Sequence, residues 1–527
     1  MDFMLIVFLV IASAVFGLAL GSSRFGPGFA FGLIINGFIL YFIMPALTIV
    51  AGLFLVALEA AAGGVLGILA TDSGFGFSPA FRHHQTSRFG PALFLFVGAA
   101  IIVLLILGAI LAPLLCASQF YALPQVTTGI SNNNSLVSSG HIREVSEETA
   151  RWRADKAVGN IGYKVGVGQM NIQSKDGKLV WLAPLDYTGT WKAWSYGQEG
   201  TGGYVLVSAE DSKDQVKLVE TTIRHTPHGL FGYNLERTLY FDYPTYLKGE
   251  TTFQLDDKGE PVWVTMLSNP AVLGMYGHVP VGIAVTNPSS GGNTFYYMNE
   301  VPTWVERVMD EEVNEEYLTY WGKYKYGFWN TIFDQKDYLK PTGGLEITDE
   351  GGNVQVGQGE NPDVYLVQGT DGKLYWFGSF TTVGKDTSMV GYTLTDLRTG
   401  KIVFYPTPSV YNDIGAAKNV QQHPEVAKVM GARVTQPIMY LVDGQEVWIM
   451  PVITPSGENV MMGAVVAKTG ETYVSPTLDG TLRQLHGQTI QADTVSPGSS
   501  TTLASLVAEL DSDLARLKEY IKNHPEE

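Results

Sequence analysis

Charged residues are scarce over the first 116 residues of this 527-residue chain, where they occur at Asp2, Arg24, Glu59, Asp72, Arg82 and Arg88. Long apolar runs lie between them, including residues 4–20 and 91–115. These runs reach or approach the roughly 20 residues that a helix needs to cross a bilayer. The scarcity of charge therefore excludes a wholly soluble protein. It predicts a membrane domain over residues 1–116 with three or four transmembrane helices.

The number of spans depends on the apolar tract at residues 29–70, which is too long for one ordinary helix. Either it forms a hairpin broken near Pro45, or it forms one tilted span followed by an interfacial segment rich in Gly and Ala. Glu59 lies deep in this tract. An acid inside a membrane indicates a proton or cation site or a subunit contact, whereas near the interface Glu59 would simply be solvated.

Basic residues are also missing after the last apolar run, and this absence predicts the orientation. Arg82 and Arg88 precede the run, and the next basic residue is Arg143. Loops that contain an excess of Lys and Arg stay on the cytoplasmic side of the membrane. We therefore expect a multi-pass protein whose large C-terminal part is extracytoplasmic. The charges of the membrane domain cancel, so the net charge of −17 belongs to this outer part. Such an acidic domain has no general attraction for nucleic acid.

Cysteine is nearly absent, with Cys116 at the end of the last apolar run as its single occurrence. The outer part must therefore fold without disulfides. Secreted eukaryotic domains commonly contain several, so the composition favours a bacterial cell-membrane protein of the cell envelope. The first apolar segment also lacks the basic start of a signal peptide, which argues against cleavage.

Recognisable catalytic motifs are missing as well. The sequence contains no G-x-S-x-G, no H-E-x-x-H and no Walker A run, and Cys116 is poorly placed for an outward-facing nucleophile. His225 and His228 are three residues apart with a proline between them, and no third ligand accompanies them. We therefore expect no catalytic residue, cofactor or metal, although an enzyme with an unrecognised site stays an alternative.

A short pattern, Gly followed four residues later by Trp, is present four times in the outer part. It reads DGKLVWL from Asp176, KGEPVWV from Lys258, DGKLYWF from Asp371 and DGQEVWI from Asp443. The glycine favours a turn and the alternation that follows favours a strand. The tryptophans share one offset, so each should lie on the same face of its strand as a core anchor: Trp181, Trp263, Trp376 and Trp448.

A second Gly-containing strand follows each tryptophan. In the last two copies the glycine comes 15 residues later, at Gly391 after Trp376 and at Gly463 after Trp448. Divergent repeats show such spacing, although turn-strand patterns also arise by chance. We expect an α+β fold, with antiparallel β-hairpins packed on helices, in one repeat pair at 143–300 and another at 346–486.

Two segments carry a family resemblance. VSEETARWRADKAVG from Val145, followed by DGKLVWL, resembles the PepSY type of module, as does AAKNVQQHPEVAKVMG from Ala416 followed by DGQEVWIMPV and AKTGETYV. LRTGKIVFY from Leu397 is similar to that module's closing turn. The resemblance covers about 145–220 and 411–475. The sequence differs from the PepSY module in its long inserts and its frequent Trp. The resemblance implies an extracytoplasmic, non-catalytic role in binding or restraining partners such as peptidases, and it assigns no functional residues.

Residues 301–345 form an insert with an acidic start and a dense aromatic stretch. The stretch either grips a peptide or a glycan ring or packs as a helix hairpin over the sheet. Its candidate binding residues are Tyr320, Trp321, Tyr324, Tyr326, Phe328 and Trp329.

Linkers rich in Ser, Thr, Asn and Gly are predicted at 117–142 and 487–502. An amphipathic heptad helix follows at 503–524, with an apolar seam of Leu503, Val507, Leu510, Leu514, Leu517 and Ile521. This helix either associates with a second copy or a partner helix, or docks on its own domain.

Taken together, these features predict a membrane-anchored extracytoplasmic binding, scaffold or regulatory protein of the bacterial cell envelope, without catalysis. Its expected partners are the lipid bilayer and an envelope protein or a second copy. The alternatives are a channel or transporter subunit with Glu59 on its pathway, and a protein that binds cell-wall polymer through its aromatic residues.

Overall fold

The computed structural model describes residues 3–21, 24–72, 89–129, 137–159, 164–350, 353–384 and 387–487. The predicted seam at 503–524, almost all of the linker at 487–502, and the two arginines that set the predicted orientation, Arg82 and Arg88, lie outside these residues.

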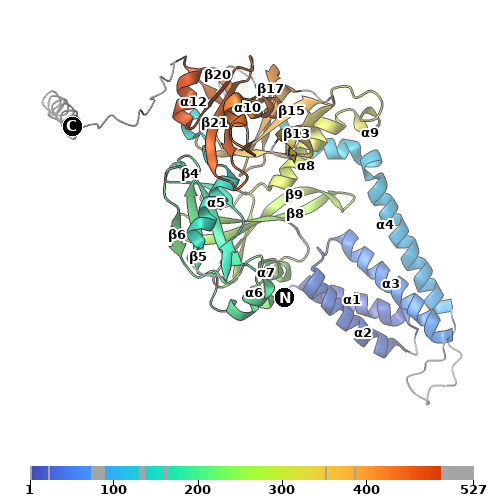
Figure 1. Ribbon diagram of the computed structural model, residues 1–527. Helices are drawn as coiled ribbons and strands as arrows, with labels where there is room; N and C mark the ends of the chain where they lie inside the picture. The colour runs from blue at the N-terminus through green and yellow to red at the C-terminus, as the bar shows by residue number, and fades with distance from the viewer. Residues whose placement is uncertain are drawn as a thin grey trace. The chain divides into compact units, whose positions relative to one another are not determined.

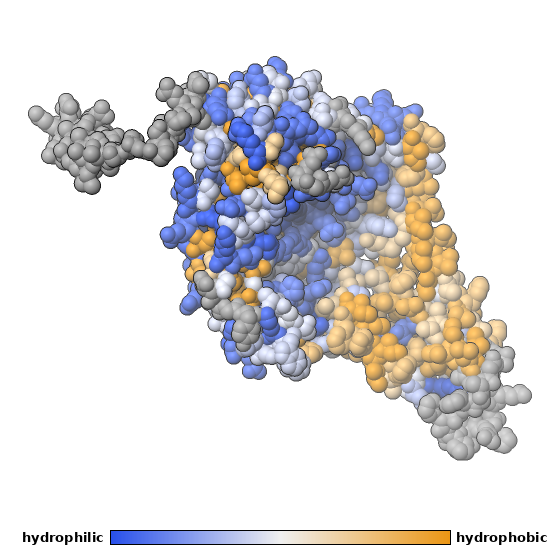
Figure 2. All heavy atoms as spheres, viewed as in Figure 1, coloured by the Kyte–Doolittle hydropathy of each residue, from blue (hydrophilic) through white to orange (hydrophobic). Residues whose placement is uncertain are grey.

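The N-terminal part consists of apolar helices: α1 (Phe3–Ala19), α2 (Phe25–Phe38) with the π-helix η2 (Ile39–Ile43), α3 (Ile49–Asp72) and α4 (Phe89–Ala122). Three segments within the described residues are long and apolar enough to cross a membrane: Phe25–Ile43, Ile49–Leu69 and Phe89–Ala122. They account for much of the apolar surface in Figure 2. The tract at 29–70 is divided around Pro45 into α2 with η2 and α3, which agrees with the break that the hairpin alternative places there.

Glycines let these helices approach one another closely. A Cβ added at Gly98 of α4 would lie 2.5 Å from the Ala57 carbonyl oxygen of α3, and one added at Gly32 of α2 would lie 3.0 Å from the Ser13 Cα of α1. Small residues at such contacts are typical of membrane helix pairs. Helix α4 also contains Pro113, and Cys116 just after it leaves the helical conformation (φ −118°, ψ 16°). Proline removes a helical hydrogen bond, which explains this kink.

The C-terminal part is β-rich and is built from four modules, each a helix followed by an antiparallel sheet. Module 1 (143–220) contains α5 (Glu147–Val158), β2 (Val165–Val167), β3 (Asn171–Lys175), β4 (Lys178–Tyr187), α6 (Thr190–Tyr196), β5 (Gly203–Ser208) and β6 (Lys217–Glu220). Module 2 (221–300) contains η5 (Phe231–Tyr233), α7 (Leu235–Asp242), β7 (Leu247–Leu255), β8 (Pro261–Val272), β9 (Tyr276–Thr286) and β10 (Asn293–Tyr297).

Modules 3 and 4 also begin with helices and continue with a sheet, and module 3 contains an additional hairpin. Module 3 (305–411) contains α8 (Glu311–Tyr324), α9 (Gly327–Asn330), β11 (Leu339–Pro341), the hairpin β12 (Gly343–Glu350) and β13 (Asn353–Pro362), β14 (Tyr365–Gln368), β15 (Leu374–Thr382), β16 (Ser388–Asp396) and β17 (Ile402–Tyr411). Module 4 (412–475) contains α10 (Asp413–Gln421), α11 (Pro424–Ala427), β18 (Arg433–Val434), β19 (Ile438–Val442), β20 (Gln445–Ile453), β21 (Asn459–Val466) and β22 (Thr472–Ser475), and α12 (Leu478–Leu485) follows it.

Each sheet has one topology around its tryptophan-bearing strand, which is β4, β8, β15 or β20. On one side this strand pairs with two short strands, or in module 2 with the bulged strand β7. On the other side two further strands follow in chain order. The predicted insert at 301–345 therefore contains the leading helix of module 3, since α8 precedes its sheet as α5 precedes the sheet of module 1. The predicted linker at 117–142 contributes β1 (Val126–Thr128), which pairs in parallel with β17.

The glycine turns form as the sequence indicates. Asp176 and Gly177 both have positive φ (53° and 75°), and so do Asp443 and Gly444 (49° and 79°). Two consecutive residues of this kind make the tight hairpin turn that matches strand twist.

The four tryptophans are core residues, each at most 4% exposed. Each indole Nε1 donates to a backbone carbonyl: Trp181 to Val145, Trp263 to His225, Trp376 to Met309 and Trp448 to Tyr411, over 2.8–3.1 Å. In modules 1, 3 and 4 the accepting residue directly precedes the residue that caps the helix N-terminus. The tryptophan thus ties the start of the helix to the middle of the sheet.

The strand register agrees in three modules and differs in the fourth. Trp181, Trp263 and Trp376 each pair with the residue four positions after the shared glycine of the next strand. Trp448 pairs with Val465, two positions after Gly463. The equal spacing of 15 residues in the last two copies therefore does not reflect equal pairing.

Both faces of β4 are buried, because the sheet of module 1 lies between two cores. Trp181, Leu179 and Ala183 belong to a core shared with module 3. Leu182, on the opposite face, belongs to a core shared with module 2, which includes Trp263. Successive side chains of a strand point to opposite faces, so this single strand joins three modules.

Candidate functional site

The starts of α5 and α8 repeat one arrangement. The sequence REVSEE from Arg143 and RVMDEE from Arg307 each place an arginine three residues before the helix cap. Ser146 and Asp310 are these caps, accepting from the backbone N–H three residues later. Two acids follow each cap, at the positive end of the helix dipole where negative charge is favoured.

Both arginines are buried against the tryptophan of their own module. The Arg143 guanidinium lies 5.4 Å from the Trp181 ring centroid, and the Arg307 guanidinium lies 4.7 Å from that of Trp376. Both residues are at most 8% exposed. The two tryptophans belong to one core cluster. The arginine and the acids at the start of α5 therefore lie in the same region as those at the start of α8.

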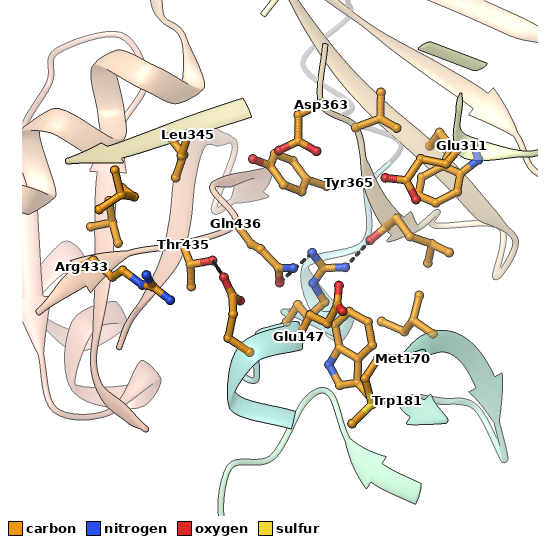
Figure 3. Close-up of a pocket in the computed structure, with 18 of the residues that line it drawn as sticks. Glu147, Met170, Trp181, Glu311, Leu345, Asp363, Tyr365, Arg433, Thr435 and Gln436 are labelled. Atoms are coloured by element: carbon orange, nitrogen blue, oxygen red, sulfur yellow. Dashed lines mark hydrogen bonds between the residues drawn. The ribbon is translucent and has the colours of Figure 1, made fainter. Parts of the chain in front are cut away.

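A cavity of about 480 Å³ lies where modules 1, 3 and 4 meet. Figure 3 shows the side chains that converge on it. Modules 1 and 3 contribute the paired arginines and acids, and module 4 contributes Arg433, Val434, Thr435 and Gln436. The volume lies within the range of small-molecule sites.

Hydrogen bonds join the modules across the cavity. Arg143 donates from Nη1 to the Leu366 carbonyl oxygen and from Nη2 to Gln436 Oε1, both over 3.1 Å. The hydroxyl of Thr435 donates to the Glu148 carboxylate over 3.1 Å. Arg143 is thus held from module 3 and from module 4, so the three modules are connected at this site.

Arg307 is paired with acids. Its Nη2 lies 2.7 Å from Glu250 Oε2 and 3.3 Å from Glu311 Oε2, while its Nε has no hydrogen-bond partner among the described residues. In contrast, no ion pair or hydrogen bond involves the Arg433 side chain within those residues, and Figure 3 shows it at the edge of the cavity near Thr435. Arg433 is therefore available to a ligand.

Three carboxyl groups of module 3 crowd together at this junction. One oxygen from each of Glu311, Glu315 and Asp363 lies within 4.8 Å of the others. Glu311 and Glu315 are one turn apart on α8, and Asp363 follows β13 and accepts a hydrogen bond from the Tyr365 hydroxyl. Such oxygen ligands suit a hard cation, so this cluster is the part of the site that could hold a metal.

Burial makes the charged forms of these acids unfavourable. It raises the pKa of Glu311 to about 7, with Arg307 partly opposing the rise. The pKa of Glu315 rises to about 8 through burial and the neighbouring charges of Glu311 and Asp363. Burial also raises the pKa of Asp363 to about 6. Near neutral pH the cluster therefore gains from a proton or from a bound cation.

The aromatic stretch predicted as a binding surface is dispersed. Tyr320 and Tyr324 pack on Phe120 of α4, with ring centroids 4.6 and 5.9 Å away. Trp321 packs into module 3, 4.9 Å from the Phe404 ring.

Past α8 the same stretch turns outward. Phe328 is partly buried against the α4 cluster, while Tyr326 and Trp329 are 47% and 58% exposed. The stretch therefore forms no single groove among the described residues, and its first half joins α8 to α4.

The remaining candidate residues are also apart from the cavity. Glu59 is 7% exposed within α3, and its Oε2 has no hydrogen-bond partner among the described residues. His225 is buried with Nδ1 near the Pro288 carbonyl oxygen, whereas His228 Nδ1 lies 2.7 Å from Asp186 Oδ2. The two histidines thus have separate partners. The heptad seam lies outside the described residues.

Sequence reasoning missed the cavity, although a signal for it exists. The hexapeptides REVSEE and RVMDEE share an arginine, an apolar residue, a cap and two acids in the same order. Aligning the module starts as well as the tryptophans would have paired Arg143 with Arg307. The contribution of module 4 has no comparable signal, because Arg433 to Gln436 form a short strand and loop.

Comparison with known proteins adds no assignment, because the sequence matches no protein-family model and no curated protein.

Proposed function

We propose that this protein is a membrane-anchored, extracytoplasmic binding protein of the bacterial envelope that acts without catalysis. Its ligand would be a small molecule carrying an ammonium group, bound in the cavity between modules 1, 3 and 4. The observation that carries the proposal is the crowded carboxyl cluster of Glu311, Glu315 and Asp363 beside a cavity of about 480 Å³.

The size and charge of the cavity support this class of ligand. The volume is far larger than a single ion requires and suits a small organic molecule. Burial disfavours the carboxylate charges, and an ammonium group would neutralise them. Arg433 at the edge offers a donor for an anionic or carbonyl group of the same molecule. A free amino acid or the terminus of a peptide combines both features.

A ligand there would affect how the modules are held together. Arg143 already links module 1 to Leu366 of module 3 and to Gln436 of module 4. Occupying the adjoining cavity adds contacts to the same three modules and would stabilise their arrangement. This suits a regulatory role, in which ligand binding changes the surface offered to an envelope partner. The PepSY resemblance is part of this proposal, and the order of helix and sheet in each module supports it.

The test uses the full chain in lipid nanodiscs, with thermal unfolding followed by tryptophan fluorescence. Amino acids, dipeptides and diamines are added in turn, with Ca²⁺, Mg²⁺ and Zn²⁺ as separate arms. We expect an amine-bearing compound to raise Tm and Glu311→Gln to weaken the effect at least tenfold in apparent Kd. Glu312→Gln, an exposed neighbour on the same helix turn, is the matched control. If metal ions alone stabilise the protein, the ligand class is wrong.

A channel or transporter subunit is the second candidate, favoured by the buried Glu59 carboxyl in α3. Intramembrane acids commonly lie on ion pathways. Proton or cation flux into proteoliposomes should then depend on Glu59 and be abolished by Glu59→Gln. Flux at the level of empty liposomes would remove this candidate.

A further inference from the structure

Helix α6 presents two tryptophans to the outside of module 1. Trp191 is 79% exposed and Trp194 is 63% exposed, an unusual state for so large an apolar side chain. Ala193 between them is buried, and the Tyr196 carbonyl accepts from the Tyr187 hydroxyl over 3.1 Å. The helix is therefore fixed to its module by one side while its tryptophans point away.

Phe231 of module 2 extends this apolar surface. Its ring centroid lies 5.5 Å from that of Trp194, in an edge-to-face arrangement, and its side chain is 46% exposed. The backbone at Phe231 has φ +50°, a left-handed conformation that is rare for a bulky residue. A strained backbone that keeps an aromatic ring exposed indicates a use for the ring.

The segment after Phe231 contacts the apolar helices directly. Arg237 donates from Nη1 to the Phe231 carbonyl oxygen over 3.0 Å and from Nε to the Tyr41 carbonyl oxygen over 2.9 Å. Its guanidinium also lies 4.4 Å from the Tyr41 ring centroid. Tyr41 belongs to η2, at the end of the apolar segment Phe25–Ile43. One arginine thus connects the exposed patch to the end of a membrane helix.

Further contacts place α7 over the ends of the helices. Tyr240 is buried in a cluster with Leu5 of α1 and Leu40 of η2. The Leu47 N–H, just before α3 begins, donates to the Pro244 carbonyl oxygen over 2.7 Å. The segment from Phe231 to Pro244 therefore lies where α1 begins, η2 ends and α3 begins, and Figure 1 shows α7 beside the start of α1.

We propose that Trp191, Trp194 and Phe231 form a second membrane contact, inserted into the headgroup and upper acyl region of the leaflet in which η2 ends. Tryptophan favours this interfacial region because its ring is apolar and its N–H is polar. The patch is continuous, through Arg237, with the helix ends that lie at that level. The inference goes beyond ligand binding and rests on insertion of the apolar helices into a bilayer.

The chain offers a direct test because its apolar helices contain no tryptophan; the first along the sequence is Trp152. Quenching of tryptophan emission by lipid must therefore come from the β-rich part. The full-length protein is placed in nanodiscs of ordinary phosphatidylcholine and in nanodiscs of phosphatidylcholine brominated near the top of its acyl chains.

We expect the brominated lipid to quench roughly a fifth of the emission, since two of the 10 tryptophans lie in the patch. The Trp191→Phe/Trp194→Phe variant should lose most of that quenching and keep the wild-type Tm, because both side chains are exposed. Trp329→Phe is the matched control, since Trp329 is 58% exposed on α9, and it should leave the quenching unchanged.

Three results would overturn the proposal. The double variant could be quenched as strongly as the wild type, or Trp329→Phe could remove the quenching in its place. The wild type could also show no quenching although it co-elutes with the nanodiscs, which would assign the patch to water or to a protein partner. Failure to co-elute would overturn membrane insertion itself, and size-exclusion chromatography distinguishes that outcome from the others.

Discussion

Replacing Glu315 with glutamine should make the protein less sensitive to alkaline pH. Glu315 lies one turn after Glu311 on α8, and both carboxyl groups crowd Asp363. Its pKa rises from 4.5 to about 8 because it is buried and because acids surround it. Glutamine keeps nearly the same size and cannot ionise, so the substitution removes the charge while leaving the packing close to native.

The direction in which stability changes with pH follows from the rise in the pKa of Glu315. The folded protein binds this proton more tightly than the unfolded chain does. The stabilisation is therefore complete below the unfolded pKa of 4.5 and is lost as pH rises through about 8. At 1.36 kcal/mol per pH unit the whole interval corresponds to about 5 kcal/mol as an upper limit. The side chain is partly exposed, and solvent screening reduces this to about 1–2 kcal/mol.

The assay is thermal unfolding of the full-length protein in nanodiscs at several pH values between about 5 and about 8.5. Wild type and Glu315→Gln should have similar Tm at the acidic end, and the variant should be more stable at the alkaline end. Glu312→Gln, at an exposed position on the same helix, should change the alkaline loss of Tm far less than Glu315→Gln, because Glu312 is one of several acids that raise the pKa of Glu315. If Glu315→Gln and wild type lose the same Tm across this interval, the crowded cluster does not titrate as argued.

Three further changes test the architecture. Trp448→Phe removes the indole N–H that donates to the partly buried Tyr411 carbonyl oxygen and should lower the free energy of chemical unfolding by about 1–3 kcal/mol. An unchanged midpoint would contradict the anchoring role. Arg307→Met should cost about 1–3 kcal/mol, because it removes charge-assisted hydrogen bonds to Glu250 and Glu311, whose side chains are partly exposed. Adding Glu311→Gln should recover part of this loss, and a purely additive double-mutant cycle would contradict the pairing. Gly98→Val should reduce Tm and the yield of folded protein, because its side chain would enter α3, whereas Gly108→Val should not, since a Cβ there meets nothing within 4 Å.

The local elements followed from the sequence because their causes are local. Asp443 and Gly444 form the tight turn that their residue types favour, and Trp448 lies on the buried face that its offset predicts. The turn chemistry and the alternation of side chains along a strand both act within a few residues of the chain.

The site did not follow, because it depends on how modules meet. The cavity requires Arg143, Asp363 and Arg433 to converge from three modules, and no spacing along the sequence encodes that convergence. The spacing of 15 residues likewise did not reveal that Trp448 pairs two positions after Gly463, whereas Trp376 pairs four positions after Gly391. The role of the aromatic stretch could not be predicted for a related reason. Tyr320 contacts α4 and Trp321 contacts β17, and both elements are distant from the stretch along the chain.

The kink of α4 has a consequence for how the cavity responds to the membrane. At 34 residues the helix is about 51 Å long, well beyond the roughly 30 Å of a hydrocarbon core. Its upper end packs on α8 through Phe120, and α8 carries the acids of the cavity. The non-helical turn at Cys116 separates this end from the apolar length below it. Before this turn, α4 also contacts module 2, where the Tyr276 hydroxyl of β9 donates to the Ala109 carbonyl oxygen over 3.2 Å. The β-rich part therefore holds α4 on both sides of the kink, and a change in the tilt of α4 with bilayer thickness would act on module 2 and on α8 together.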